Sequence, residues 1–182
     1  MTRYVALLRA INVGGHVVKM DALRKHFSRM GFTNVETFIA SGNVLFDARD
    51  DEPAALEERI ASELERSLGY AVGTFLRTPA ELAGIVRHRP FDAAVIDPEQ
   101  HALYIGFLPR KPGTETARKI VGLRTPVDEF HLHKRELYWG CRTRFSDSEV
   151  NGALLERTIA MPMTVRNITT VRKLAAKLSQ SS

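Results

Sequence analysis

The chain has 182 residues and a formal net charge of +5, with 44% hydrophobic and 26% charged side chains. This composition is typical of a soluble globular protein, and no apolar run approaches the roughly 18 to 20 residues that span a bilayer. The mild positive charge permits an anionic ligand but is not dense enough to indicate a nucleic-acid-binding protein. A single cysteine, Cys141, excludes an internal disulfide, and the N-terminus does not resemble a signal peptide, so we expect a cytoplasmic protein.

The first half of the chain predicts the element order β-α-β-β-α-β. Short apolar runs and alternating residues indicate strands, and apolar residues at spacings of three and four indicate helices. In chain order, the predicted elements occupy residues 4–8, 20–30, 35–39, 44–46, 53–68 and 72–76. The turn formers at 40–43 predict a hairpin between the second and third strands. This order is the split-βαβ, or ferredoxin-like, arrangement.

A linker helix is predicted next, because Thr78, Pro79 and Glu81 form a capping box at its start. The second half then repeats the element order. Its predicted strands occupy residues 102–108, 129–133, 136–139 and 163–165, and its helices are expected around 117–121 and 150–154. A second capping box, Ser146 with Glu149, is expected to open the latter helix.

One more amphipathic helix is predicted over residues 168–178, with Asn167 as its cap. The sequence therefore predicts an α+β protein. It consists of two ferredoxin-like (βαββαβ) subdomains with antiparallel sheets, at residues 1–88 and 89–182, together with the linker and C-terminal helices.

Three stretches carry a family resemblance: YVALLRAINVGG at 4–15, ASGNVLF at 40–46 and TVRNITTVRKL at 164–174. They resemble the bacterial family catalogued as domain of unknown function 1697, over nearly the whole chain. The resemblance implies two ferredoxin-like subdomains, in agreement with the element order. It implies no activity, because the family has none established. Where the family usually has an aromatic residue after the C-terminal Arg-Asn pair, this chain has Ile168.

The junction after the first strand is the first candidate site. Arg9 offers a charged fork, Asn12 offers orientation, and Gly14 with Gly15 allows close backbone approach. Such a junction before a helix binds phosphate or carboxylate groups, so we expect a small anionic, phosphate-bearing ligand. The pattern lacks the features of a P-loop or a dinucleotide fingerprint, and a tight loop with Arg9 paired to an acid is the alternative.

Two further segments are candidate parts of that site. Ser41 and Asn43 lie in the hairpin turn, and Arg166, Asn167 and Thr170 lie at the start of the C-terminal helix. A simple turn and a simple helix cap are the alternative interpretations. Because the first strand is central in this fold, we expect its end and the hairpin turn to share a site only if the loops fold over one another.

Other chemistries are less well supported by the sequence. His131 and His133 lie on one face of a strand, but no third ligand with suitable spacing is visible, so no metal site is predicted. No cofactor motif, acid–base pair or nucleophile emerges, and whether the protein is an enzyme stays open. The basic and aromatic hairpin at 131–145 makes an RNA-binding module one alternative function. A protein-interaction module without catalysis is another.

Overall fold

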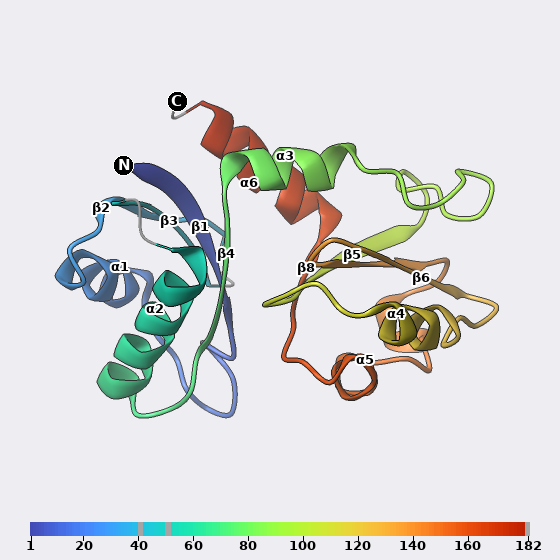
Figure 1. Ribbon diagram of the computed structural model, residues 1–182, viewed down its shortest axis with the longest axis horizontal. Helices are drawn as coiled ribbons and strands as arrows, with labels where there is room; N and C mark the ends of the chain where they lie inside the picture. Colours follow the sequence, from blue (N-terminus) through green and yellow to red (C-terminus); the bar gives the residue numbers. More distant parts are fainter. Residues whose placement is uncertain (40–41, 50–51, 181–182) are drawn as a thin grey trace. The chain divides into compact units, whose positions relative to one another are not determined.

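The computed structural model describes residues 1–39, 42–49 and 52–180, which contain two four-stranded sheets with helices between the strands (Figure 1). Sheet A has the order β2-β3-β1-β4 and sheet B the order β6-β7-β5-β8. Every neighbouring pair of strands is antiparallel. This is the ferredoxin-like topology, formed twice, so the predicted α+β fold is confirmed.

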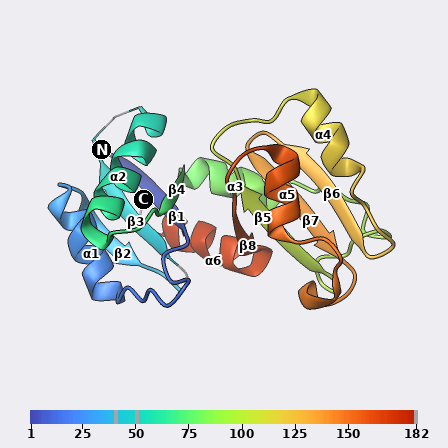
Figure 2. The same ribbon diagram turned by 90° about the horizontal axis from the view of Figure 1, so that it is seen from below.

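The elements of the first half follow the predicted order. They are β1 (Thr2–Arg9), α1 (Met20–Arg29), β2 (Thr33–Thr37), β3 (Asn43–Ala48), α2 (Pro53–Leu68), β4 (Gly73–Arg77) and α3 (Pro79–Arg87). Helices α1 and α2 lie on one face of sheet A (Figure 2). The apolar stripe of α1 buries Leu23 and Phe27 against Tyr4 and Phe46 of the sheet. Phe27 and Phe46 meet edge to face, with ring centroids 5.3 Å apart.

The second half contains β5 (Ala102–Phe107), α4 (Thr114–Val121), β6 (Asp128–His133), β7 (Glu136–Cys141), η1 (Phe145–Asp147), α5 (Gly152–Ile159), β8 (Thr164–Asn167) and α6 (Ile168–Ser179). Helices α4 and α5 cover one face of sheet B (Figure 1). Trp139 is buried in this core, and its indole N–H donates to the buried carboxylate of Asp128 at 2.8 Å.

The chain divides into two compact units. Unit 1 comprises Met1–Gly84 and Arg172–Ser182, and unit 2 comprises Ile85–Val171. The predicted division at residues 88 and 89 placed all of the C-terminal helix with the second subdomain. In the structure, most of α6 belongs to unit 1.

Two details of the predicted secondary structure are wrong. Strand β2 ends at Thr37, and Ile39 has a φ of 57°, which no strand accepts. Helix α5 begins at Gly152 and is capped by Asn151, whose Oδ1 accepts from the amide of Leu154 at 2.9 Å. Ser146 therefore does not cap this helix. The Thr78–Glu81 box is confirmed, because the two residues exchange hydrogen bonds as such a box requires.

Candidate functional site

The end of β1 lies beside the start of β3 and the start of β4. The amide of Leu8 donates to the carbonyl of Gly42 at 2.8 Å, and Arg9 pairs with Gly73 across the sheet. A Cβ at Gly73 would lie 3.2 Å from the Cβ of Arg9, so glycine leaves room for the stem of that arginine. Folding-over of the loops is not needed to bring the hairpin turn near β1, because β3 is the strand next to β1 in this topology.

The loop from Ala10 to Lys19 is held by a hydrogen bond within it and by contacts with Tyr70. Asn12 accepts a hydrogen bond from the amide of Val18 through Oδ1 at 2.7 Å. The hydroxyl of Tyr70 donates to the carbonyl of Ile11 at 2.8 Å, and the ring of Tyr70 stacks on His16 with centroids 4.0 Å apart. These contacts stabilise the loop, and the side-chain oxygen of Asn12 is used within it.

Gly14 and Gly15 lie at the exposed part of this loop, with φ values of 61° and 84°. Both need the left-handed conformation that glycine adopts most easily. A Cβ at either position would meet nothing within 4 Å, so the space above the two glycines is open. Helix α1 begins at Met20, with Lys19 as its cap, so the glycines belong to the loop and not to the first turn of the helix.

Of the two candidates in the hairpin turn, the structure describes Asn43 and not Ser41. Asn43 is 1% exposed, and its Nδ2 donates to the carbonyl of Phe38 at 3.0 Å. The amide of Phe38 donates in return to the carbonyl of Asn43 at 3.0 Å. Asn43 therefore links the start of β3 to Phe38, and it pairs with Leu7 of β1 across the sheet.

The C-terminal candidates belong to unit 2. Arg166 is 8% exposed, and its Nη1 donates to Oγ1 of Thr164 at 2.8 Å and to the carbonyl of Val165 at 2.9 Å. Burial lowers the pKa of Arg166 to about 10. Asn167 caps α6, since its Oδ1 accepts from the amide of Thr169 at 2.7 Å. Thr170 is half-buried in the first turn of α6.

The basic and aromatic hairpin does not present its rings as a stacking surface. Tyr138 and Trp139 are each 1% exposed. The guanidinium of Arg142 donates to the carbonyls of Val95 and Pro126 and pairs with Glu129 at 3.3 Å. Phe145 is exposed, but it lies on η1 beyond the sheet strands. The RNA-binding alternative therefore has no support from the arrangement of these side chains.

Sequence reasoning missed His88, which the fold brings to His131 and His133. One ligand nitrogen from each of the three lies within 4.8 Å of the other two. His88 follows α3, more than forty residues before the other two in the chain, and no short motif relates positions so far apart. The alternation of His131 and His133 on one strand was the available signal, and it gave two of the three.

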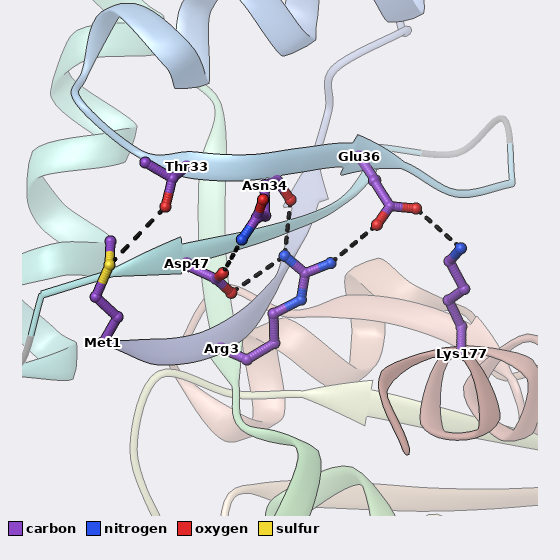
Figure 3. Close-up of polar contacts among 7 residues, drawn as sticks. All are labelled: Met1, Arg3, Thr33, Asn34, Glu36, Asp47 and Lys177. Carbon is purple, nitrogen blue, oxygen red and sulfur yellow. Dashed lines mark hydrogen bonds and ion pairs between the residues drawn. The ribbon is translucent and has the colours of Figure 1, made fainter. Parts of the chain in front are cut away.

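A second polar cluster lies in unit 1, where Arg3 bridges β2 and β3 (Figure 3). Its guanidinium contacts carboxylates of Glu36 and Asp47, each at 3.1 Å, and the carbonyl of Asn34 at 2.7 Å. Lys177 of α6 reaches the other oxygen of Glu36 at 2.9 Å. The hydrogen bond and charge of Lys177, together with the charge of Arg3, hold the pKa of Glu36 below its usual value. The cations and the carboxylates of this cluster compensate one another's charge, so we interpret the cluster as a structural network.

Comparison with known proteins agrees with the fold described above. Residues 1–138 match the family described as a protein of unknown function, DUF1697. The chain belongs to this family. A solved structure, that of the conserved bacterial protein SP0830 from Streptococcus pneumoniae, superposes with a TM-score of 0.75 at 24% identity. The match covers 98% of this chain and 99% of SP0830, and at that identity it establishes the fold alone.

No curated protein matches the sequence. Within the described residues, no helix combines the length and apolar character needed to cross a membrane.

Proposed function

We propose that this protein binds a small anionic, phosphate-bearing ligand at the end of β1. Arg9 supplies the positive charge, and the backbone around Gly14 and Gly15 approaches the anion. Asn12 holds the loop in shape, and Asn43 supports the neighbouring turn. The proposed site consists of residues of unit 1 alone, because Arg166 is buried in unit 2 and Asn167 caps its helix there.

One observation carries this proposal: an exposed arginine stands beside an ordered loop whose two glycines are left-handed and open to space. If the glycines served only to make room for packed neighbours, a Cβ at those positions would meet other atoms, as it does at Gly42, where it would lie 2.7 Å from Ile11. The open space at the two glycines leaves room for an anion beside their backbone, and a guanidinium adds a bidentate fork for phosphate oxygens.

The proposal includes a cytoplasmic location. The single cysteine, Cys141, is buried in unit 2 and forms no disulfide, which suits a reducing compartment.

Thermal stabilisation by phosphate, sulfate and a panel of small nucleotides tests the site, with wild type compared with Arg9→Gln. A charge-assisted hydrogen bond contributes about 1.5–3 kcal/mol, so we expect Arg9→Gln to weaken binding roughly ten- to a hundredfold. The matched control is Arg49→Gln, which removes an exposed arginine after the other end of β3. It is expected to leave binding unchanged.

Two further variants separate the charge from the backbone. Arg9→Lys is expected to restore only part of the affinity, because an ammonium group cannot form the bidentate fork. Gly15→Val is expected to weaken binding by blocking the approach to the backbone, and circular dichroism checks that it still folds. A folded Arg9→Gln variant that every anion stabilises as strongly as wild type would contradict the proposal.

A further inference from the structure

The strand β6 presents two imidazoles on one face of sheet B. His131 and His133 are two residues apart, so their side chains point the same way, and their rings are nearly parallel with centroids 6.5 Å apart. Phe130, between Asp128 and this pair, faces the core covered by α4 and α5. The histidines therefore lie on the face of the sheet away from those helices, on the edge strand.

The segment that follows α3 lies across the same face and brings in the third imidazole. Ile96 is 1% exposed and fills the space over Gly140, where a Cβ would come within 2.7 Å of it. The carbonyl of Val95 accepts from Nε of Arg142 at 2.9 Å. These two contacts hold the segment against the sheet. The ring of His88 stacks on that of His133 with centroids 4.1 Å apart, and its centroid lies 5.4 Å from that of His131.

The nitrogens of the three rings are close enough to share one ion. One from each residue lies within 4.8 Å of the others, and in a tetrahedral zinc site such nitrogens are about 3.4 Å apart. Binding of one ion would therefore require the three side chains to rotate from the stacked arrangement, so that their nitrogens approach a common centre. All three residues are half-buried, so an ion from solvent reaches the group.

Two polar atoms at this cluster have no partner. Nε2 of His88 and the hydroxyl of Tyr138 are buried, and neither forms a hydrogen bond within the described residues. The ring of Tyr138 lies 5.0 Å from that of His88, and Tyr138 pairs with His131 across the two strands. Buried polar atoms without partners are rare in folded proteins, and both of these atoms belong to residues whose rings pack at this cluster.

We propose that His88, His131 and His133 bind a divalent transition-metal ion such as Zn²⁺. Imidazole nitrogens suit Zn²⁺, Cu²⁺ and Ni²⁺, whereas Mg²⁺ and Ca²⁺ prefer oxygen ligands, and this group contains no carboxylate. Three protein ligands leave a fourth position for water or a ligand from solution. Burial lowers the pKa of both His88 and His131, and the charge of His133 adds to this effect in each case, as do His131 and Lys134 for His88.

Isothermal titration of untagged, EDTA-treated protein with Zn²⁺ tests this site. We expect one Zn²⁺ per chain, with a dissociation constant in the micromolar range or tighter, and no binding of Mg²⁺. Co²⁺ is expected to give the visible absorption bands of a four-coordinate site. We expect Zn²⁺ binding to weaken at least about tenfold in each of the variants His88→Gln, His131→Gln and His133→Gln. Loss of a residue that only hydrogen-bonds to a metal ligand already causes a change of about that size.

His26→Gln is the matched control, since it removes a histidine of α1 in unit 1 and is expected to bind Zn²⁺ as wild type does. Circular dichroism of each metal-free variant separates loss of the site from loss of the fold. The proposal is overturned if Zn²⁺ does not bind saturably, or if folded His88→Gln binds it as tightly as the control. This site consists of residues of unit 2 and the proposed anion site of residues of unit 1, so either proposal can fail without the other.

Discussion

The two units have sheets of the same topology, but one equivalent row of paired residues across the four strands carries different side chains in each. In sheet A this row runs Glu36, Leu45, Val5 and Arg77, and in sheet B it runs His131, Tyr138, Ile105 and Arg166. Both rows end in a buried arginine on the fourth strand. The rows differ at the other end, where the edge strand carries a carboxylate in unit 1 and an imidazole in unit 2.

The partners of those edge residues explain the difference. Glu36 lies between the cations Arg3 and Lys177, so its charge is compensated within the fold. His131 lies near His88 and His133, which carry the same charge as His131 whenever they are protonated. Grouping like charges does not stabilise a folded chain. Charge compensation thus gives a structural explanation for the network of unit 1, whereas for the cluster of unit 2 we propose a metal ion.

The two units are alike in having an apolar core between the sheet and its helices. The largest effect on stability is expected from a substitution in one of these cores. Phe27 of α1 is fully buried among Phe32 and Phe46. Phe27→Ala removes this packing and leaves a cavity, so we expect a loss of about 3–5 kcal/mol in the free energy of unfolding. Urea denaturation followed by circular dichroism measures it. An unchanged midpoint would show that the stripe of α1 does not hold unit 1 together.

The next prediction concerns the segment that carries His88. Gly140 occupies the position of Asp47 in the equivalent strand of unit 1, and Ile96 packs directly over it. Gly140→Ala forces Ile96 outward, so we expect about 1–3 kcal/mol of destabilisation from overpacking and weaker Zn²⁺ binding, because His88 moves with the segment. Gly84→Ala is the control, since a Cβ there meets nothing within 4 Å. Undiminished affinity in folded Gly140→Ala would mean that Ile96 does not position His88.

The two rows also differ in their dependence on pH. The pKa values of His88 and His131 are lowered in the folded protein, so the unfolded chain takes up protons first as pH falls below about 6.5. Metal-free protein is therefore expected to lose stability between pH 7.5 and 5.5. The pKa of Glu36 is also lowered, and its stabilising contribution is lost only at more acidic pH, as its carboxylate becomes protonated.

Melting temperatures at several pH values, measured in EDTA, check this prediction. His88→Gln is expected to flatten the loss between pH 7.5 and 5.5, because it removes one such group and relieves His131 of a neighbouring charge. Glu36→Gln is expected to leave the fall in melting temperature between pH 7.5 and 5.5 unchanged. An equal slope in His88→Gln and wild type would contradict the assignment of the acid sensitivity to unit 2.

Most of the fold was predictable because its signals are local. The stripe of α1, Pro53 at the start of α2 and the box at Thr78 are all visible within a few residues of sequence. One error arose where two residues could serve as the same helix cap, and the other where Ile39, although β-branched, has a positive φ that ends the strand pattern. Asn151 won the cap of α5 over Ser146, and the nearby Ser148 hydroxyl donates to Asp128, far away in sequence, at 2.8 Å.

The candidate site was predictable only in its pieces. The motif around Gly14 showed that the loop needs glycines, yet nothing in it showed that Tyr70 holds the loop or that Gly73 makes room for Arg9. The histidine cluster depends even more on the fold, since His88 meets His133 only after the segment behind α3 has crossed sheet B. Long-range contacts of this kind follow from topology and register, which no local pattern records.

The smallest expected effect is the coupling energy of one ion pair in the network of unit 1, that between Glu36 and Lys177. The side chain of Glu36 is 43% exposed and that of Lys177 is 36% exposed, so solvent screens their attraction. A double-mutant cycle of Glu36→Gln and Lys177→Met is therefore expected to give a coupling of about 0.2–1 kcal/mol, as for other exposed ion pairs. Added salt should reduce it further, and neither variant should change Zn²⁺ affinity. A coupling well above this range would mean that the Glu36 row of unit 1 does more than compensate charge, and the contrast with the His131 row would then weaken.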